Sequence, residues 1–190
     1  MRFPIHTRLK DGTPVELVLA GADDLSAVQE LHRVIIEEGT SYPHKEPFDA
    51  EGAWDYWFSD KRTVGAYVLD RGGRSDLVGM FYLKANFPGR AGKVANAGFI
   101  VAPEWRSRGL GRLLGTTMLE YAKSLGFHSV LFNLVFSENH ASRRLWKKLG
   151  FVEIGSVPKA VQNDDGTFQD AIIMFRSLTQ TMVVTDTHRE

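Results

Sequence analysis

The segment from Val101 to Arg112 has the residue types and spacing that bind an anion. Pro103 ends an apolar run, and Gly109 and Gly111 open a segment with helical spacing. Glycines let the backbone approach a ligand closely, and the amides of a first helical turn have no acceptor within the helix. The helix dipole adds positive potential at the same point. We therefore expect a phosphate-binding turn here; the alternative is a glycine-rich turn that only reverses the chain.

Three arginines, Arg106, Arg108 and Arg112, surround this turn in the sequence. Guanidinium groups form strong, paired hydrogen bonds with phosphate oxygens. The segment is therefore suited to a pyrophosphate.

Two familiar phosphate-binding motifs, the P-loop and the dinucleotide fingerprint, do not match this turn. The Gly-x4-Gly-Lys-Ser/Thr pattern of a P-loop is absent. The spacing Gly109-x-Gly111-x3-Gly115 is similar to a dinucleotide fingerprint, in which the strand should run directly into the first glycine. Here residues 103–108 lie between the strand and Gly109, so the sequence does not favour a dinucleotide fold.

The elements that must hold this turn form a mixed α/β pattern. Alternating and β-branched runs predict strands, periodic apolar residues predict helices, and Arg71-Gly72-Gly73-Arg74 indicates a hairpin. The predicted strands cover 15–20, 64–69, 77–83, 94–101, 129–136, 152–157 and 168–175, and the predicted helices cover 25–38, 53–58, 109–125 and 139–149. We expect a mixed sheet with helices on both faces.

The chain has 190 residues, of which 43% are hydrophobic, enough to build the core of one domain. We assign this domain to residues 15–176. Residues 1–14 are expected to form an N-terminal extension and residues 177–190 a loose tail, because the tail has little to bury.

Composition excludes several classes of function. The 23 basic and 23 acidic residues balance, which argues against a nucleic-acid or membrane-surface partner. The absence of Cys excludes disulfides and a cysteine nucleophile, and no His/Asp/Glu spacing indicates a metal site. No apolar run is long enough to span a bilayer, and the N-terminus lacks a secretory signal, so we expect a cytoplasmic protein.

Two sequence motifs, found in the same order along the chain, resemble those of the GNAT superfamily of N-acetyltransferases. Arg106-x-x-Gly109-x-Gly111 is similar to its motif A, and the stretch from Asn139 to Phe151 is similar to its motif B, Asn-x-x-Ala/Ser-x-x-x-Tyr-x-x-x-Gly-Phe. The resemblance covers nearly the whole chain. It implies a central sheet that splays apart, and acetyl-CoA as the donor.

The resemblance also implies which residues bind acetyl-CoA. The turn Arg106, Ser107, Arg108, Gly109, Leu110, Gly111 and Arg112 would hold the pyrophosphate, mainly through backbone amides. The free edge of the strand Phe99, Ile100 and Val101 would pair with the pantetheine arm, and an N–H near Ile100 or Val101 would polarise the thioester carbonyl. Asn139 would contact the pantetheine or thioester, although Asn is also a favoured helix N-cap.

The chain departs from this superfamily at both usual proton-transfer positions. The strand 94–101 carries no Glu as general base, and Trp146 replaces the Tyr that acts as general acid. The superfamily usually transfers the acetyl group directly, which agrees with the absence of Cys. The substrate amine could lose its proton to water, or another polar group such as His44 could act as the base. Surface positions are expected for His44 and His140.

Two amides lie in strands that are otherwise apolar, Asn96 in Ala-Asn-Ala and Asn133 in Leu-Phe-Asn-Leu-Val. A buried amide needs hydrogen-bond partners. Either the two amides are structural and bond each other, or they bind a carboxylate or amine of the substrate. The pattern resembles a fungal subgroup that acetylates the proline analogue azetidine-2-carboxylate. By that resemblance Asn96 and Asn133 contact the substrate, and the loop with Tyr42 covers the acceptor site.

The sequence therefore predicts an acetyl-CoA-dependent N-acetyltransferase acting on a small amine, such as an amino acid or proline analogue. The alternatives are a protein or peptide N-acetyltransferase and a non-catalytic acyl-CoA-binding module. A homodimer is expected by analogy only.

Overall fold

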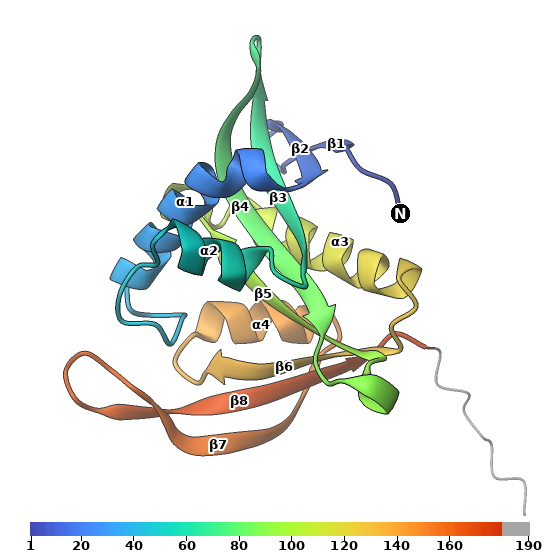
Figure 1. Ribbon diagram of the computed structural model, residues 1–190. Helices are drawn as coiled ribbons and strands as arrows, with labels where there is room; N and C mark the ends of the chain where they lie inside the picture. The colour runs from blue at the N-terminus through green and yellow to red at the C-terminus, as the bar shows by residue number, and fades with distance from the viewer. Residues whose placement is uncertain (180–190) are drawn as a thin grey trace, which may run out of the picture.

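The computed structural model describes residues 1–179 and contains one eight-stranded sheet with the strand order β1-β2-β3-β4-β5-β6-β8-β7 (Figure 1). The strands are β1 (Ile5–Arg8), β2 (Pro14–Leu19), β3 (Arg62–Asp70), β4 (Gly73–Ala85), β5 (Val94–Val101), β6 (Ser129–Phe136), β7 (Val152–Gln162) and β8 (Phe168–Ser177). The helices are α1 (Leu25–Glu37), α2 (Ala50–Trp57), α3 (Leu110–Ser124) and α4 (His140–Lys148). This architecture confirms the predicted mixed α/β class.

The two ends of the chain differ from the expectation. Residues 5–8, assigned to an extension, form β1 and pair antiparallel with β2. Ser177, assigned to the tail, is the last residue of β8 and pairs with Ser129. The rest of the predicted tail, from residue 180 onward, lies outside the described residues.

The sheet splays between β5 and β6. These two strands are the parallel pair of the sheet, and their register contains only Val94 with Ser129 and Ala95 with Val130. Beyond this point β6 continues antiparallel to β8, with an irregularity between Phe132 and Val135. The rest of β5 therefore has a free edge on the side of β6.

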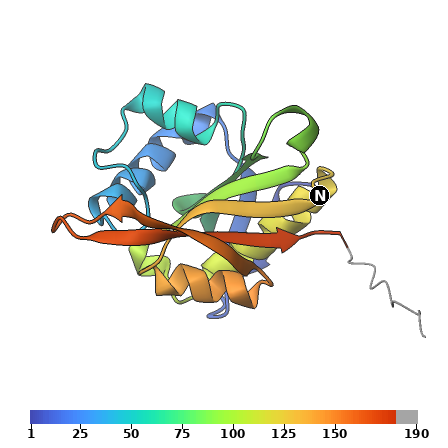
Figure 2. The same ribbon diagram turned by 90° about the horizontal axis from the view of Figure 1, so that it is seen from below.

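Helices cover both faces of the sheet, as Figure 2 shows from below. Alternate residues of β5 face opposite ways, so Ile100 packs with α1 and α2, whereas Ala97 belongs to the larger core under α3 and α4. The α1–α2 core includes Val28, Ile35, Trp57, Met80 and Tyr82. None of the helices in residues 1–179 has the length and apolar character that crossing a bilayer requires.

Candidate functional site

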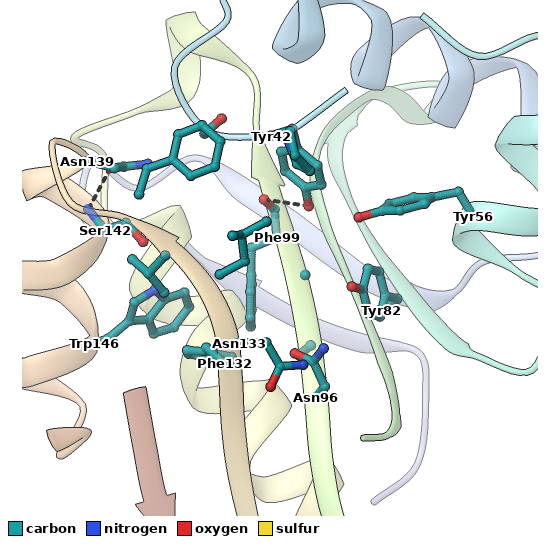
Figure 3. Close-up of a pocket in the computed structure, with 17 residues that line it drawn as sticks. Tyr42, Tyr56, Tyr82, Asn96, Phe99, Phe132, Asn133, Asn139, Ser142 and Trp146 are labelled. Atoms are coloured by element: carbon teal, nitrogen blue, oxygen red, sulfur yellow. Dashed lines mark hydrogen bonds between the residues drawn. The ribbon is translucent and has the colours of Figure 1, made fainter. Parts of the chain in front are cut away.

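Two cavities meet where β5 and β6 separate. The smaller, which we call the splay cavity, has a volume of about 290 Å³, and the larger, the long groove, about 890 Å³. Both are lined by Ser41, Phe99, Asn139, Ser142 and Trp146. Figure 3 shows the splay cavity between the tyrosines of one wall and Trp146 of the other.

The backbone of β5 offers hydrogen-bond donors to this junction. Ala102 N–H donates to Val78 at 2.9 Å and Asn86 N–H donates to Val94 at 2.8 Å, so the even-numbered residues of β5 direct their backbone groups at β4. The odd-numbered residues therefore direct theirs at the splay. Val101 is one of them, but Ile100 is not, because its N–H serves the ladder with β4.

Phe99 is the odd-numbered residue at the junction of the two cavities, whereas Val101 lines only the long groove. The Phe99 carbonyl accepts a hydrogen bond from the Tyr42 hydroxyl at 3.2 Å (Figure 3). The N–H of Phe99, which was not predicted as a donor, is thus directed at the junction.

The glycine-rich turn has the backbone geometry of an anion site. Gly109 is the N-cap of α3 with φ of 92°, a conformation that side chains of L-residues rarely adopt. The first helical bond of α3 runs from Leu113 N–H to Gly109 at 3.0 Å, which leaves the preceding amides without helical acceptors. Gly111 and Ser107 line the long groove. Leu110 can contribute only its backbone to the turn, because its side chain is buried in the core.

The three arginines of this turn do not converge as expected. Arg106 lines the long groove, but its guanidinium pairs with the carboxylate of Glu38 at 2.9 and 2.6 Å. Arg108 lies over the ring of Trp105, 4.7 Å from its centroid, and its Nη1 is 3.5 Å from Asp11. Arg112 is exposed on α3. The positive charge at the turn is therefore partly balanced by carboxylates from the N-terminal half of the chain.

The side chains of the second motif are held by helix α4 and by an aromatic cluster. The Asn139 Oδ1 accepts from the Ser142 N–H at 3.0 Å, so Asn139 is the N-cap of α4 while also lining both cavities. Trp146 is 5% exposed and packs against Phe99 and Phe132 with ring centroids 4.7 and 4.8 Å away. Its indole ring fills space at the junction and cannot serve as the general acid.

The amides of Asn96 and Asn133 both line the splay cavity (Figure 3). They do not bond each other: Asn133 Nδ2 donates to Asn86 Oδ1 at 2.7 Å, and Asn86 Nδ2 donates back to Asn133 at 3.1 Å. Asn86 directly follows β4 and was not predicted from the sequence, where it comes just before the loop Phe87-Pro88-Gly89-Arg90. If Asn133 has a purely structural role, its hydrogen-bond partner is therefore Asn86 and not Asn96.

Three tyrosines form the wall of the splay cavity that faces α1 and α2. Tyr42 lies in the loop expected to cover the acceptor, and Tyr56 and Tyr82 were not predicted. Burial raises the pKa of all three phenols above the ordinary value of 10, and that of Tyr42 well above it. They stay protonated at neutral pH. Gly98 makes room for this wall, because a Cβ there would lie 2.5 Å from Tyr82 Cε1.

His44 does not reach the splay cavity but joins a buried aromatic cluster behind it. This cluster centres on His32, whose exposed fraction is 1% and whose ring stacks on Tyr56 at 5.4 Å. Neither ring nitrogen of His32 has a hydrogen-bond partner among the described residues. Burial, together with the neighbouring His44, lowers the His32 pKa to about 4. Burial lowers the pKa of His44 as well, so both imidazoles are mainly neutral at pH 7.

With this geometry in place, the comparisons with known proteins agree on one class. The acetyltransferase (GNAT) family model matches residues 28–151. N-acetyltransferase aca1 of Schizosaccharomyces pombe is 45% identical over 137 residues, which is 66% of this chain and 66% of that protein. The chain thus spans about two thirds of the length of that relative.

Solved structures show the same fold. A GCN5-related N-acetyltransferase from Kribbella flavida is 30% identical with a TM-score of 0.77, covering 86% of this chain and 97% of that one. A phosphinothricin acetyltransferase from Sinorhizobium meliloti, solved in complex with acetyl-CoA, has a TM-score of 0.74 at 21% identity, covering 93% and 99%. The chain belongs to the GNAT family, and its class is that of the acetyl-CoA-dependent N-acetyltransferases.

The site residues fit acetyl-CoA as the donor. The amides at Gly109 to Gly111 can hold a pyrophosphate, and the free edge of β5 can accept an amide-bearing arm like an added strand. The groove reaches from this turn to the splay cavity, with which it shares Phe99 and four other lining residues. Within residues 1–179 no group of three His, Asp or Glu side chains could hold a metal ion.

Proposed function

We propose that this enzyme acetylates the amine of a small molecule, such as an amino acid or proline analogue, by direct transfer. The observation that supports this acceptor is the splay cavity, a space of about 290 Å³ closed on one side by Tyr42, Tyr56 and Tyr82. This volume lies at the small end of ligand pockets and suits an amino acid better than an extended peptide.

Each part of the site then has a distinct task. The amides of the turn at Gly109 bind the pyrophosphate, and Asn139 and the edge of β5 align the pantetheine arm. Bound acetyl-CoA supplies an activated acetyl thioester at the junction of the cavities. The N–H of Phe99, or that of Val101 further along the same edge, donates to the thioester carbonyl and stabilises negative charge there. Asn96 and Asn133 orient the acceptor.

No side chain of the splay cavity takes a proton from the acceptor, so the amine gives its ammonium proton to solvent before it attacks. As the C–S bond breaks, the proton that the nitrogen releases passes to the leaving thiolate of coenzyme A, directly or through water. The residues lining the splay cavity include no Asp, Glu, His, Lys or Arg, and the three phenols stay protonated. The acceptor amine therefore attacks in its neutral form, and the rate should rise with pH until the amine is fully deprotonated. This proton route takes the place of the missing Glu and Tyr.

The test incubates the enzyme and acetyl-CoA with a panel of candidate acceptors. The panel contains amino acids, cyclic imino acids, simple amines and short peptides. Thiol release gives rates, and mass spectrometry identifies products. We expect acetylation of free amino or imino acids. Acetylation of peptides alone would support the protein acetyltransferase, and acetyl-CoA binding without any turnover would support the binding module.

A substitution separates acceptor binding from donor binding. Asn96→Ala should raise the KM for the acceptor about tenfold or more and leave the KM for acetyl-CoA nearly unchanged. Ser75→Ala, in the exposed β3–β4 hairpin, is the matched control. Equal effects on both substrates would assign Asn96 a structural role.

A further inference from the structure

The indole of Trp146 lies where the splay cavity and the long groove meet. Trp146 lines both cavities although it is almost fully buried. Figure 3 shows it across the cavity from the tyrosines. Because the free edge of β5 at Phe99 leads the pantetheine arm to this junction, the indole borders the space that is left for the acyl group of the bound donor.

The indole is held in place on the sides that face away from the cavity. Its ring centroid lies 4.7 Å from that of Phe99, 4.8 Å from that of Phe132 and 5.7 Å from that of Phe151. Helix α3 closes the space behind it, because a Cβ on Gly115 would lie 3.1 Å from Trp146 Cζ3. A close-packed interior leaves no void into which such a ring could withdraw. The indole is therefore a rigid part of the cavity wall.

The acceptor and the acyl chain meet different layers of the molecule. The tyrosine wall packs with the α1–α2 core, whereas Trp146 and Phe132 belong to the core under α3 and α4. An acceptor bound against the tyrosines leaves the acyl chain the side of the cavity that Trp146 and Phe132 close. Each methylene added to an acetyl group would have to enter there.

The departure from the family motif adds bulk at this point. The motif has Tyr where this chain has Trp146, and an indole is larger than a phenol. One extra methylene in a tight apolar pocket changes kcat/KM about 10–200-fold, and a wall that cannot move penalises the longer chain. The larger ring therefore favours a short acyl group.

We propose that Trp146 sets the length of the acyl group that this enzyme transfers, admitting acetyl and rejecting longer chains. This inference goes beyond the proposed function, because it concerns the donor and holds for any acceptor amine. Trp146 acts through its volume and exchanges no proton, so it is a specificity-determining residue for the donor.

The experiment compares acetyl-, propionyl- and butyryl-CoA with one accepted acceptor. Wild-type kcat/KM should fall at least tenfold from acetyl to propionyl, and further for butyryl. Trp146→Phe should raise the ratio of propionyl to acetyl transfer about tenfold, and Trp146→Leu should extend transfer to butyryl. Phe151→Leu is the matched control, because Phe151 is buried in the same aromatic cluster but lines neither cavity. It should keep the wild-type ratios.

Ratios between donors do not depend on the folded fraction of a variant, since incomplete folding lowers transfer from all three donors equally. Isothermal titration adds a measurement that needs no acceptor. Wild-type enzyme should bind butyryl-CoA at least tenfold more weakly than acetyl-CoA, and Trp146→Leu should close this gap.

Three outcomes would overturn the inference. These are equal use of the three donors by wild-type enzyme, unchanged ratios in both Trp146 variants, and the same shift in Phe151→Leu, which would assign the effect to the aromatic cluster as a whole. A panel in which no small amine is acetylated would instead overturn the proposed function. The titration would still test the role of Trp146 in that case.

Discussion

The carboxylate of Glu38 forms a two-point ion pair with the guanidinium of Arg106, at 2.9 and 2.6 Å. Glu38 is the C-cap of α1, directly before the loop that carries Tyr42, and Arg106 precedes the glycine-rich turn. The pair therefore joins the proposed donor side of the site to the loop that we expect to cover the acceptor. It also places a negative charge next to the proposed pyrophosphate site.

Removing this negative charge should strengthen donor binding. Glu38→Gln frees the guanidinium of Arg106 for phosphate, so we expect acetyl-CoA to bind about three- to tenfold more tightly, within the range of a partly exposed ion pair. Arg106→Gln should weaken binding instead. Isothermal titration at two salt concentrations checks both variants, because the gain from Glu38→Gln should shrink as salt screens it. A weaker affinity for Glu38→Gln would show that the pair is needed to shape the turn.

A charge placed in the first turn of α3 tests the anion site itself. Gly111 lines the long groove and its φ is not in the left-handed region, so Asp and Asn can both be accommodated once Leu145 shifts slightly. Asp at a helix start favours the helix by about 0.3–1 kcal/mol. We therefore expect Gly111→Asp to fold at least as stably as Gly111→Asn.

The affinity for acetyl-CoA should be lower for Gly111→Asp than for Gly111→Asn, the opposite of the order in stability. Gly111→Asp should bind acetyl-CoA at least tenfold more weakly than Gly111→Asn, because its carboxylate faces the pyrophosphate. The two variants differ by one charge at nearly equal size, so the comparison removes the steric effect. Equal affinities would place the pyrophosphate elsewhere.

The sequence predicted much of the fold and the position of the turn, because those signals are local. Apolar periodicity marks α3 and β5, and the glycines mark the turn between them. Strand β1 was missed because Ile5 to Arg8 is a short edge strand with alternate residues exposed, a pattern shared with loops.

The partners that shape the site could not be predicted, since they come from distant parts of the chain. Asn86 meets Asn133 across 47 residues, and Glu38 meets Arg106 across 68. Both contacts depend on how the sheet splays and on where α1 ends. The three arginines therefore looked like one cluster in the sequence, although the fold disperses them.

Filling the space at Gly98 should damage the acceptor side selectively. A Cβ there would lie 2.5 Å from Tyr82 Cε1 and 3.0 Å from the Tyr42 hydroxyl, so Gly98→Ala must displace the tyrosine wall. We expect a stability loss of about 1–3 kcal/mol and a clear rise in acceptor KM. The KM for acetyl-CoA should change little. Combining Gly98→Ala with Tyr82→Leu should recover part of the stability, as chemical denaturation would measure, and no recovery would mean that the strain lies in the backbone.

Burial of His32 predicts a dependence of stability on pH. Its pKa is about 4 in the folded protein, against an ordinary value of 6.5, so the unfolded chain binds the additional proton between these values. The free energy of unfolding should therefore fall as pH decreases from about 6.5 to about 4, by up to about 3 kcal/mol for this group. Burial also lowers the pKa of His44, which adds to the same trend.

Replacing His32 with Phe should remove most of this slope. The ring nitrogens of His32 have no partners among the described residues, so Phe gives up no hydrogen bond there and keeps the aromatic contacts with Tyr56 and Trp57. At pH 5 the variant should be about 2 kcal/mol more stable than wild type. Urea unfolding between pH 4 and 8 measures both slopes, with Ile35→Val on the same helix as a control that lowers stability by about 1 kcal/mol at every pH. Parallel curves for wild type and His32→Phe would show that His32 gains a proton without leaving the folded core.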